Sequence, residues 1–149
     1  MIGPSFRFRL ERIRALRERR EEEAKLELAG AMARRNECEQ ALTSAAQQVQ
    51  SARSAQLPTG PSSADDLVSR QAYLERVESV HRATLSQLQH HEQNVAGHRD
   101  ALTEAARDRQ ALERLKANRL ADHQREAARQ DAAALDEIAI NGFRRRAVA

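Results

Sequence analysis

Aromatic residues are scarce in this sequence: it has no tryptophan, and only three phenylalanines and one tyrosine occur among 149 residues. Aromatic side chains supply much of the apolar area that stabilises globular cores, so their scarcity argues against a thick, layered core. Proline and glycine are also few, at three and five residues, which leaves long stretches without a helix breaker. Charged residues, in contrast, make up 32% of the chain, and Ala, Gln and Leu are abundant. This composition is typical of long helices and coiled coils.

Cys38 is the only cysteine, so no internal disulfide can form, which fits a reducing compartment. The N-terminal residues contain no apolar signal-peptide run, and no stretch approaches the roughly 20 apolar residues of a membrane span. The formal net charge is only +3, and charges of opposite sign alternate along most of the chain, as on a solvated helix surface. We therefore expect a cytoplasmic protein.

Motifs that carry catalysis are missing. The sequence has no nucleotide loop of the form GxxxxGK(S/T) or GxGxxG, no GxSxG, no HExxH and no paired CxxC. Active sites also lie in concave pockets, which two packed helices do not provide. We expect a protein that is not an enzyme and that has no cofactor, no metal site and no small-molecule substrate.

One cluster of helix breakers divides the chain, the segment Leu57-Pro58-Thr59-Gly60-Pro61-Ser62-Ser63. Two prolines around a glycine end a helix firmly, and Ser63, followed by two aspartates, offers the start of the next helix. Pro4-Ser5 marks the start of the first helical stretch, and Gly142, followed by three arginines, marks the end of the second.

These marks predict an all-α fold, a single domain over residues 1–149. It consists of two long helices in an antiparallel coiled-coil hairpin, the second helix being the longer. The predicted elements are a helix over about 5–56, a loop over about 57–64 and a helix over about 65–141.

Each predicted helix carries a seven-residue repeat, which defines the a and d positions of a coiled-coil seam. In the first helix one column reads Glu21, Leu28, Arg35, Leu42, Val49, and the other reads Ala24, Ala31, Cys38, Ala45, Ala52. In the second helix the columns read Leu67, Leu74, His81, Leu88, Val95, Leu102 and Val77, Thr84, His91, His98, Ala105, Leu112. The column of small residues predicts a close approach of the two helices.

Folding the chain near residue 60 pairs residue i with roughly residue 120 − i. The first helix then runs out near Leu112, and the apolar seam of the second helix ends at Leu115. Residues from about 116 to 140 are therefore expected to overhang as a single helix, about 35 Å long at 1.5 Å per residue. A lone polar helix is marginally stable in water, and docking in a partner would explain why the chain has one.

Three of the five histidines, His81, His91 and His98, occupy seam columns. They could form a metal site, a pH sensor or polar layers that set the register. Two histidines four residues apart, the spacing that suits a metal on one helix, are absent, so polar layers are preferred. We hypothesise that acidification loosens the hairpin, because charged imidazoles would enter the seam. An unchanged melting temperature at mildly acidic pH would refute this.

Residues 7–20 hold seven arginines, which raises the possibility of nucleic-acid binding. Interleaved glutamates favour a solvated helix face instead, and aromatic platforms for single strands are almost absent. The Pro-Gly-Pro turn and the alanine column also argue against a basic zipper. We expect no nucleic-acid partner. Phe6 and Phe8, with Ile2, either anchor at a membrane surface or staple a helix start, and Tyr73 either covers the seam or anchors an interface.

Three segments carry a resemblance to a known family. In chain order they are FRFRLERI at 6–13, continued by LRERREEEA at 16–24; QAYL at 71–74, followed by Val77; and LDEIA at 135–139, followed by Phe143 and basic residues. In this order and spacing they resemble the FliJ family of flagellar type III export proteins, along essentially the whole chain. Arg14-Ala15 departs from the family pattern, which more often has an apolar residue there.

The resemblance implies an antiparallel coiled coil similar to the central stalk of rotary ATPases. It also implies three partners: the hexameric export ATPase, the large membrane protein of the export gate, and export chaperones. Such a protein would couple the ATPase to export and assist chaperone handling, peripherally at the cytoplasmic face of the inner membrane. Carried onto this chain, the ATPase-facing residues are Phe6, Phe8, Arg9, Arg12, Arg17, Arg20, Arg119, Arg125 and Arg129. The gate-facing residues are Leu42, Val49, Tyr73, Val77 and Val80.

Two alternatives stay open at this point. The stalk protein of a virulence-type type III secretion system shares the hairpin and the ATPase partner, and only the neighbouring genes would separate it from a flagellar protein. A nucleic-acid-binding coiled coil belongs to a different class, and salt-sensitive retention of DNA would support it.

Overall fold

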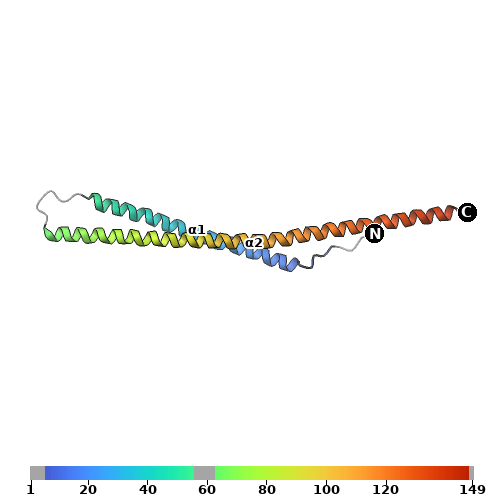
Figure 1. The fold of residues 1–149 in the computed structure, drawn as a ribbon, viewed down its shortest axis with the longest axis horizontal. Helices are drawn as coiled ribbons and strands as arrows, with labels where there is room; N and C mark the ends of the chain where they lie inside the picture. Colours follow the sequence, from blue (N-terminus) through green and yellow to red (C-terminus); the bar gives the residue numbers. More distant parts are fainter. Residues whose placement is uncertain (1–5, 56–62, 148–149) are drawn as a thin grey trace. The chain divides into compact units, whose positions relative to one another are not determined.

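Two α-helices make up this computed structural model, which describes residues 6–55 and 63–147 (Figure 1). Helix α1 spans Glu11–Ser54 with 44 residues, and helix α2 spans Ala64–Ala147 with 84 residues. No strand occurs within the two described ranges. The helices pack against each other, which confirms the predicted all-α hairpin with a longer second helix.

Each helix contributes to two compact units. Unit 1 combines Met1–Arg20 with Ala105–Ala149, and unit 2 is the continuous segment Glu21–Glu104. Unit 1 therefore contains the start of α1 and the later part of α2, and unit 2 contains the rest of both helices.

The helices of unit 2 run antiparallel, because partners on α2 fall in residue number as those on α1 rise. The interhelical pairs include Glu27 with His98 (3.5 Å), Arg35 with Glu92 (3.7 Å), Cys38 with the Thr84 carbonyl (3.7 Å), and Arg53 with Glu78 (2.6 Å). In unit 1 the same order is given by Glu11 with Lys116 and Arg17 with Asp108.

The register differs from the predicted one. The two residue numbers of each pair in unit 2 total between 122 and 131, whereas a fold at residue 60 requires 120. The shift begins beside the loop, where the Arg70 guanidinium donates to the carbonyl oxygen of Ala55. The described residues of α2 before Arg70 therefore have no partner on α1. Leu67, which was predicted to lie in the seam, is accordingly 49% exposed.

The other predicted seam positions are the least exposed of both helices. The alanine–cysteine column of α1 is buried throughout, and so is Glu21. On α2 the buried residues are Val77, Leu88 and Val95. The remaining members of the four columns, apart from Leu67, are half-buried. This confirms the seven-residue repeat as the pattern that brings the helices together.

Helix α2 begins with a reciprocal cap. The Ser63 amide donates to the Asp66 carboxylate (3.1 Å), and the Asp66 amide donates to the Ser63 hydroxyl (3.2 Å). The Asp66 amide also donates to the Ser63 carbonyl (3.1 Å), so the cap adds a side-chain acceptor to that backbone contact and satisfies the Ser63 amide. The helix start predicted at Ser63 is confirmed.

The other helix ends differ from the prediction. Helix α1 begins at Glu11 rather than near residue 5, and it ends at Ser54; Pro4-Ser5 and most of the predicted loop lie outside the described residues. Helix α2 continues through Gly142 to Ala147, and no described glycine has a positive φ. A single glycine costs a helix about 1 kcal/mol, and three arginines in the last turn favour continuation because they complement the helix dipole. Within the described ranges, neither helix has a segment apolar enough to cross a membrane.

Candidate partner-binding surfaces

Residues Phe6–Leu10 of unit 1 form a non-helical segment, here called the strap. Exposure alternates along it: Phe6, Phe8 and Leu10 are half-buried, whereas Arg7 and Arg9 are exposed. The segment ends in a turn at Arg9-Leu10, in which the Glu11 amide donates to the Phe8 carbonyl (3.1 Å). The alternation of apolar and basic residues in the sequence could have indicated a non-helical segment here. The predicted helix over about 5–56 ran through this segment instead.

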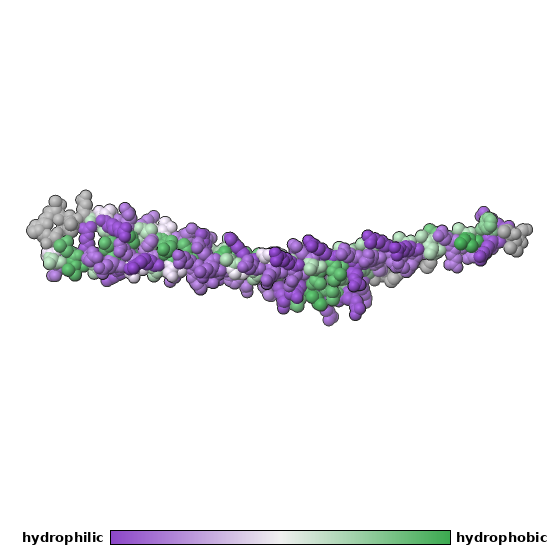
Figure 2. All heavy atoms as spheres, viewed as in Figure 1, coloured by the Kyte–Doolittle hydropathy of each residue, from purple (hydrophilic) through white to green (hydrophobic). Residues whose placement is uncertain are grey.

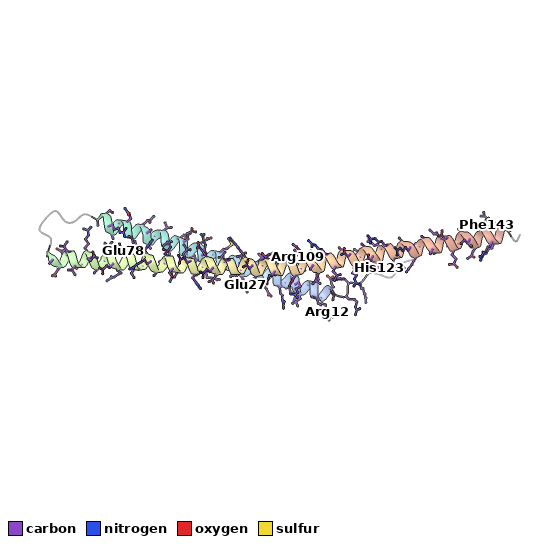
Figure 3. All side chains as sticks on the ribbon, viewed as in Figure 1. Arg12, Glu27, Glu78, Arg109, His123 and Phe143 are labelled. Atoms are coloured by element: carbon purple, nitrogen blue, oxygen red, sulfur yellow. The ribbon has the colours of Figure 1, made fainter. Side chains whose placement is uncertain are left out.

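The strap lies against α2. The ring of Phe6 meets His123 edge-on, with ring centroids 5.7 Å apart and an interplanar angle of 62°. Further along, the strap and α2 enclose a groove of about 290 Å³, lined by Arg7, Phe8, Arg9, Leu10, Leu115 and Arg119. Figure 2 shows an apolar patch where α1 begins, and Figure 3 labels Arg12 near that point and His123 on α2.

Ion pairs fix the start of α1 to α2. The Lys116 ammonium donates to the Glu11 carboxylate (2.8 Å), and Arg14 donates to the same group (2.9 Å). The hydrogen bond from Lys116, followed by that from Arg14, lowers the pKa of Glu11 below its ordinary value of 4.5. Glu11 in turn raises the pKa of Arg14. Both hydrogen bonds favour the ionised form of Glu11 over its neutral form.

All nine predicted ATPase-facing residues lie in unit 1, but they differ in availability. Arg17 is half-buried and bound to Asp108, so it holds the unit together. Arg125 and Arg129 pair with acidic residues of their own helix, at 3.4 and 3.9 Å. The exposed arginines that have no ion-pair partner in the described part of unit 1 include Arg9, Arg12, Arg20 and Arg119, and also Arg7, which the sequence analysis did not select.

Beyond His123, no contact between α2 and another described segment of unit 1 is present. The contacts with Lys116 and His123 mean that the predicted overhang begins about two turns later than residue 116. Side chains from 124 to 146 are exposed, except for two half-buried alanines. Large apolar residues are exposed near its end: Leu135 at 66%, Ile138 at 68%, Ile140 at 53% and Phe143 at 75%. Figure 3 labels Phe143 there.

The five predicted gate-facing residues all lie in unit 2, and most of them pack between the helices. Val77 is buried, at 6% exposure, while Leu42 and Val49 are half-buried. Tyr73 and Val80 are half exposed, at 51% and 50%. They are seven residues apart and so share one face of α2. Of the five, these two offer surface to a partner.

Among the seam histidines, His98 lies 3.5 Å from Glu27 of α1. The hypothesis that acidification separates the helices stays a prediction. Among the described residues, no three His, Cys, Asp or Glu side chains converge as metal ligands do.

Comparison with known proteins bears on these surfaces. The family model described as flagellar FliJ protein matches residues 6–147. No curated protein and no solved structure matches the chain. The match runs from the strap to the last turn of α2 and includes both candidate surfaces. This chain therefore belongs to the FliJ family of flagellar proteins, a family concerned with flagellar protein export.

Proposed function

We propose that this protein acts as a stalk in flagellar type III export, binding the hexameric export ATPase through unit 1. The observation that carries this proposal is the single-helix end of α2, which extends beyond its contact with the strap and presents apolar and basic side chains to solvent. An exposed helix with this composition is stable only marginally by itself. Binding inside a ring of subunits would bury the apolar residues and order the helix.

The mechanism would be allosteric. A helix inside a ring makes different contacts with each subunit, and those differences bias each subunit between its conformations and so bias nucleotide turnover. The protein itself would hydrolyse nothing. In unit 2, the exposed pair Tyr73 and Val80 is the proposed contact for the membrane protein of the export gate, which would hold the chain at the cytoplasmic face of the inner membrane. Export chaperones are the third proposed partner.

ATPase turnover measured with the full chain and with a chain ending at Gln124 tests the proposal. The shorter chain keeps every interhelical contact of unit 1 described above, including Phe6 with His123. The full chain should stimulate the cognate export ATPase, and the shorter chain should not. Circular dichroism of both proteins provides the control for folding. Equal stimulation by the two chains would show that the end of α2 is not the binding element.

The family match favours the flagellar system over a virulence-type secretion system. Swapping the partner checks this choice. The chain should stimulate the flagellar export ATPase more strongly than a virulence-type ATPase from the same cell.

A further inference from the structure

The groove between the strap and α2 combines an apolar floor with a basic rim. Phe8, Leu10 and Leu115 provide the apolar part, and the arginines lining it are Arg7, Arg9 and Arg119. Its volume of about 290 Å³ lies at the small end of ligand pockets. It has room for one or two side chains of a protein partner rather than for a large ligand.

The rim arginines differ from Arg14 and Arg17, the two arginines at the start of α1 that form ion pairs. Arg14 and Arg17 are each bound to a carboxylate of unit 1. Arg7, Arg9 and Arg119 have no such partner within the described part of the unit. Three cations around one apolar floor repel one another, and carboxylates placed between them would relieve that repulsion. A guanidinium also binds a carboxylate through two parallel hydrogen bonds.

We propose that this groove binds an acidic segment of a protein partner, in which an apolar side chain flanked by carboxylates contacts Phe8 and Leu115. The inference rests on the proposed function in one respect, because it takes the export ATPase ring as that partner. A nucleic-acid backbone would use the arginines but not the leucines of the floor. An anionic membrane would not need a groove of this size.

Binding of the full-length chain to the cognate ATPase hexamer tests the charged rim. The triple variant Arg7→Glu, Arg9→Glu, Arg119→Glu should bind about tenfold more weakly or worse, and its affinity should depend less on salt. A matched control changes three exposed arginines of the same unit that do not line the groove, Arg19→Glu, Arg107→Glu and Arg114→Glu. The control makes the same change in net charge and should bind within about threefold of the unmodified chain.

The apolar floor has its own matched pair. Leu115 lines the groove and is 36% exposed, whereas Leu120 lies outside it and is 37% exposed. Leu115→Ala should weaken binding about tenfold, and Leu120→Ala should have little effect. Helicity measured for every variant separates a loss of binding from a loss of folding, and Leu115→Ala leaves the charge of the groove intact.

The outcomes separate this inference from the proposed function. If the unmodified chain binds the hexamer and the groove variants bind as well as their controls, the groove is not the contact, although the stalk proposal stands. If the unmodified chain does not bind the hexamer, both fail. A photo-crosslinking residue in place of Phe8 should capture an ATPase peptide that has Asp or Glu beside an apolar residue. Capture of a basic peptide, or groove-dependent binding to DNA or to anionic vesicles instead of the hexamer, overturns the inference.

Discussion

Replacing Ala31 with leucine tests how closely the two helices of unit 2 approach each other. Ala31 is 2% exposed, the lowest value in the seam. The register of the neighbouring pairs places it opposite Val95, which is also buried, at 7%. A leucine adds three carbon atoms to a position that has no free surface, so the helices must move apart or the side chain must adopt a strained rotamer.

The expected cost follows from packing alone. Leucine and alanine have similar helix propensities, so the substitution hardly changes the stability of the isolated helix. Extra methylene groups in a packed core destabilise by about 1–3 kcal/mol. For a unit of this size, that lowers the melting temperature by roughly 5–15 °C.

Thermal unfolding followed by circular dichroism measures this change, with Ala33→Leu as the control. Ala33 lies on the same helix, two residues away, but it is exposed. The control should melt within a few degrees of the unmodified chain, while Ala31→Leu should melt well below it. If Ala31→Leu is as stable as Ala33→Leu, the helices are not in close contact at the alanine column and the packing argument is wrong.

Three further perturbations give separate tests. The pKa of Glu11 is lowered in the folded state, so the contribution of Glu11 to stability is present above pH 4.5, its ordinary pKa, and is lost as the pH falls below that value. Hydrogen exchange of the first turns of α1 should therefore accelerate below pH 4.5. Glu11→Gln should remove this pH dependence. Ser63→Ala deletes one half of the reciprocal cap and should cost about 0.5–2 kcal/mol, measured by urea unfolding, whereas Ser63→Asp should keep most of the stability. Tyr73→Ala with Val80→Ala should leave unfolding nearly unchanged, because both side chains are half exposed, but should weaken retention by the export-gate protein; unchanged retention would exclude this face.

The sequence predicted the seam well because a seven-residue repeat records directly which side of each helix is buried. Glu21 illustrates this, since the repeat selected a charged residue that proved to be buried. The strap was missed because the helix prediction ran through Phe6–Leu10, where the exposure alternates every two residues. The end of α2 was missed because Gly142 was taken as a stop signal, although one glycine costs too little to end a long helix.

The seven-residue repeat did not predict which arginines form ion pairs and which do not. Arg17 meets Asp108, which is 91 residues away in the chain. Whether they meet depends on the register, which the seven-residue repeat of each helix does not fix by itself. A shift of a few residues changes every interhelical ion pair but leaves the buried columns on the same faces of the helices.

The contacts inside unit 1 differ in kind from those inside unit 2, and this difference bears on function. Every described residue that is buried lies in unit 2. In unit 1, the start of α1 contacts α2 through the ion pairs of Glu11 with Lys116 and Arg17 with Asp108, and the strap adds the contact of Phe6 with His123. Partly exposed ion pairs contribute about 0–1 kcal/mol each and are screened by salt, whereas the seam of unit 2 rests on apolar contacts.

Raising the salt concentration to about 1 M should therefore accelerate hydrogen exchange in residues 11–20 much more than in residues 24–52. Equal protection of both segments at high salt would contradict this division of forces. The same difference applies to binding: a partner should displace the partly exposed ion pairs at the start of α1 more readily than the apolar contacts of the alanine seam. The proposed stalk function assigns the contact with the ATPase ring to unit 1, which is the unit that these contacts make the easier of the two to rearrange.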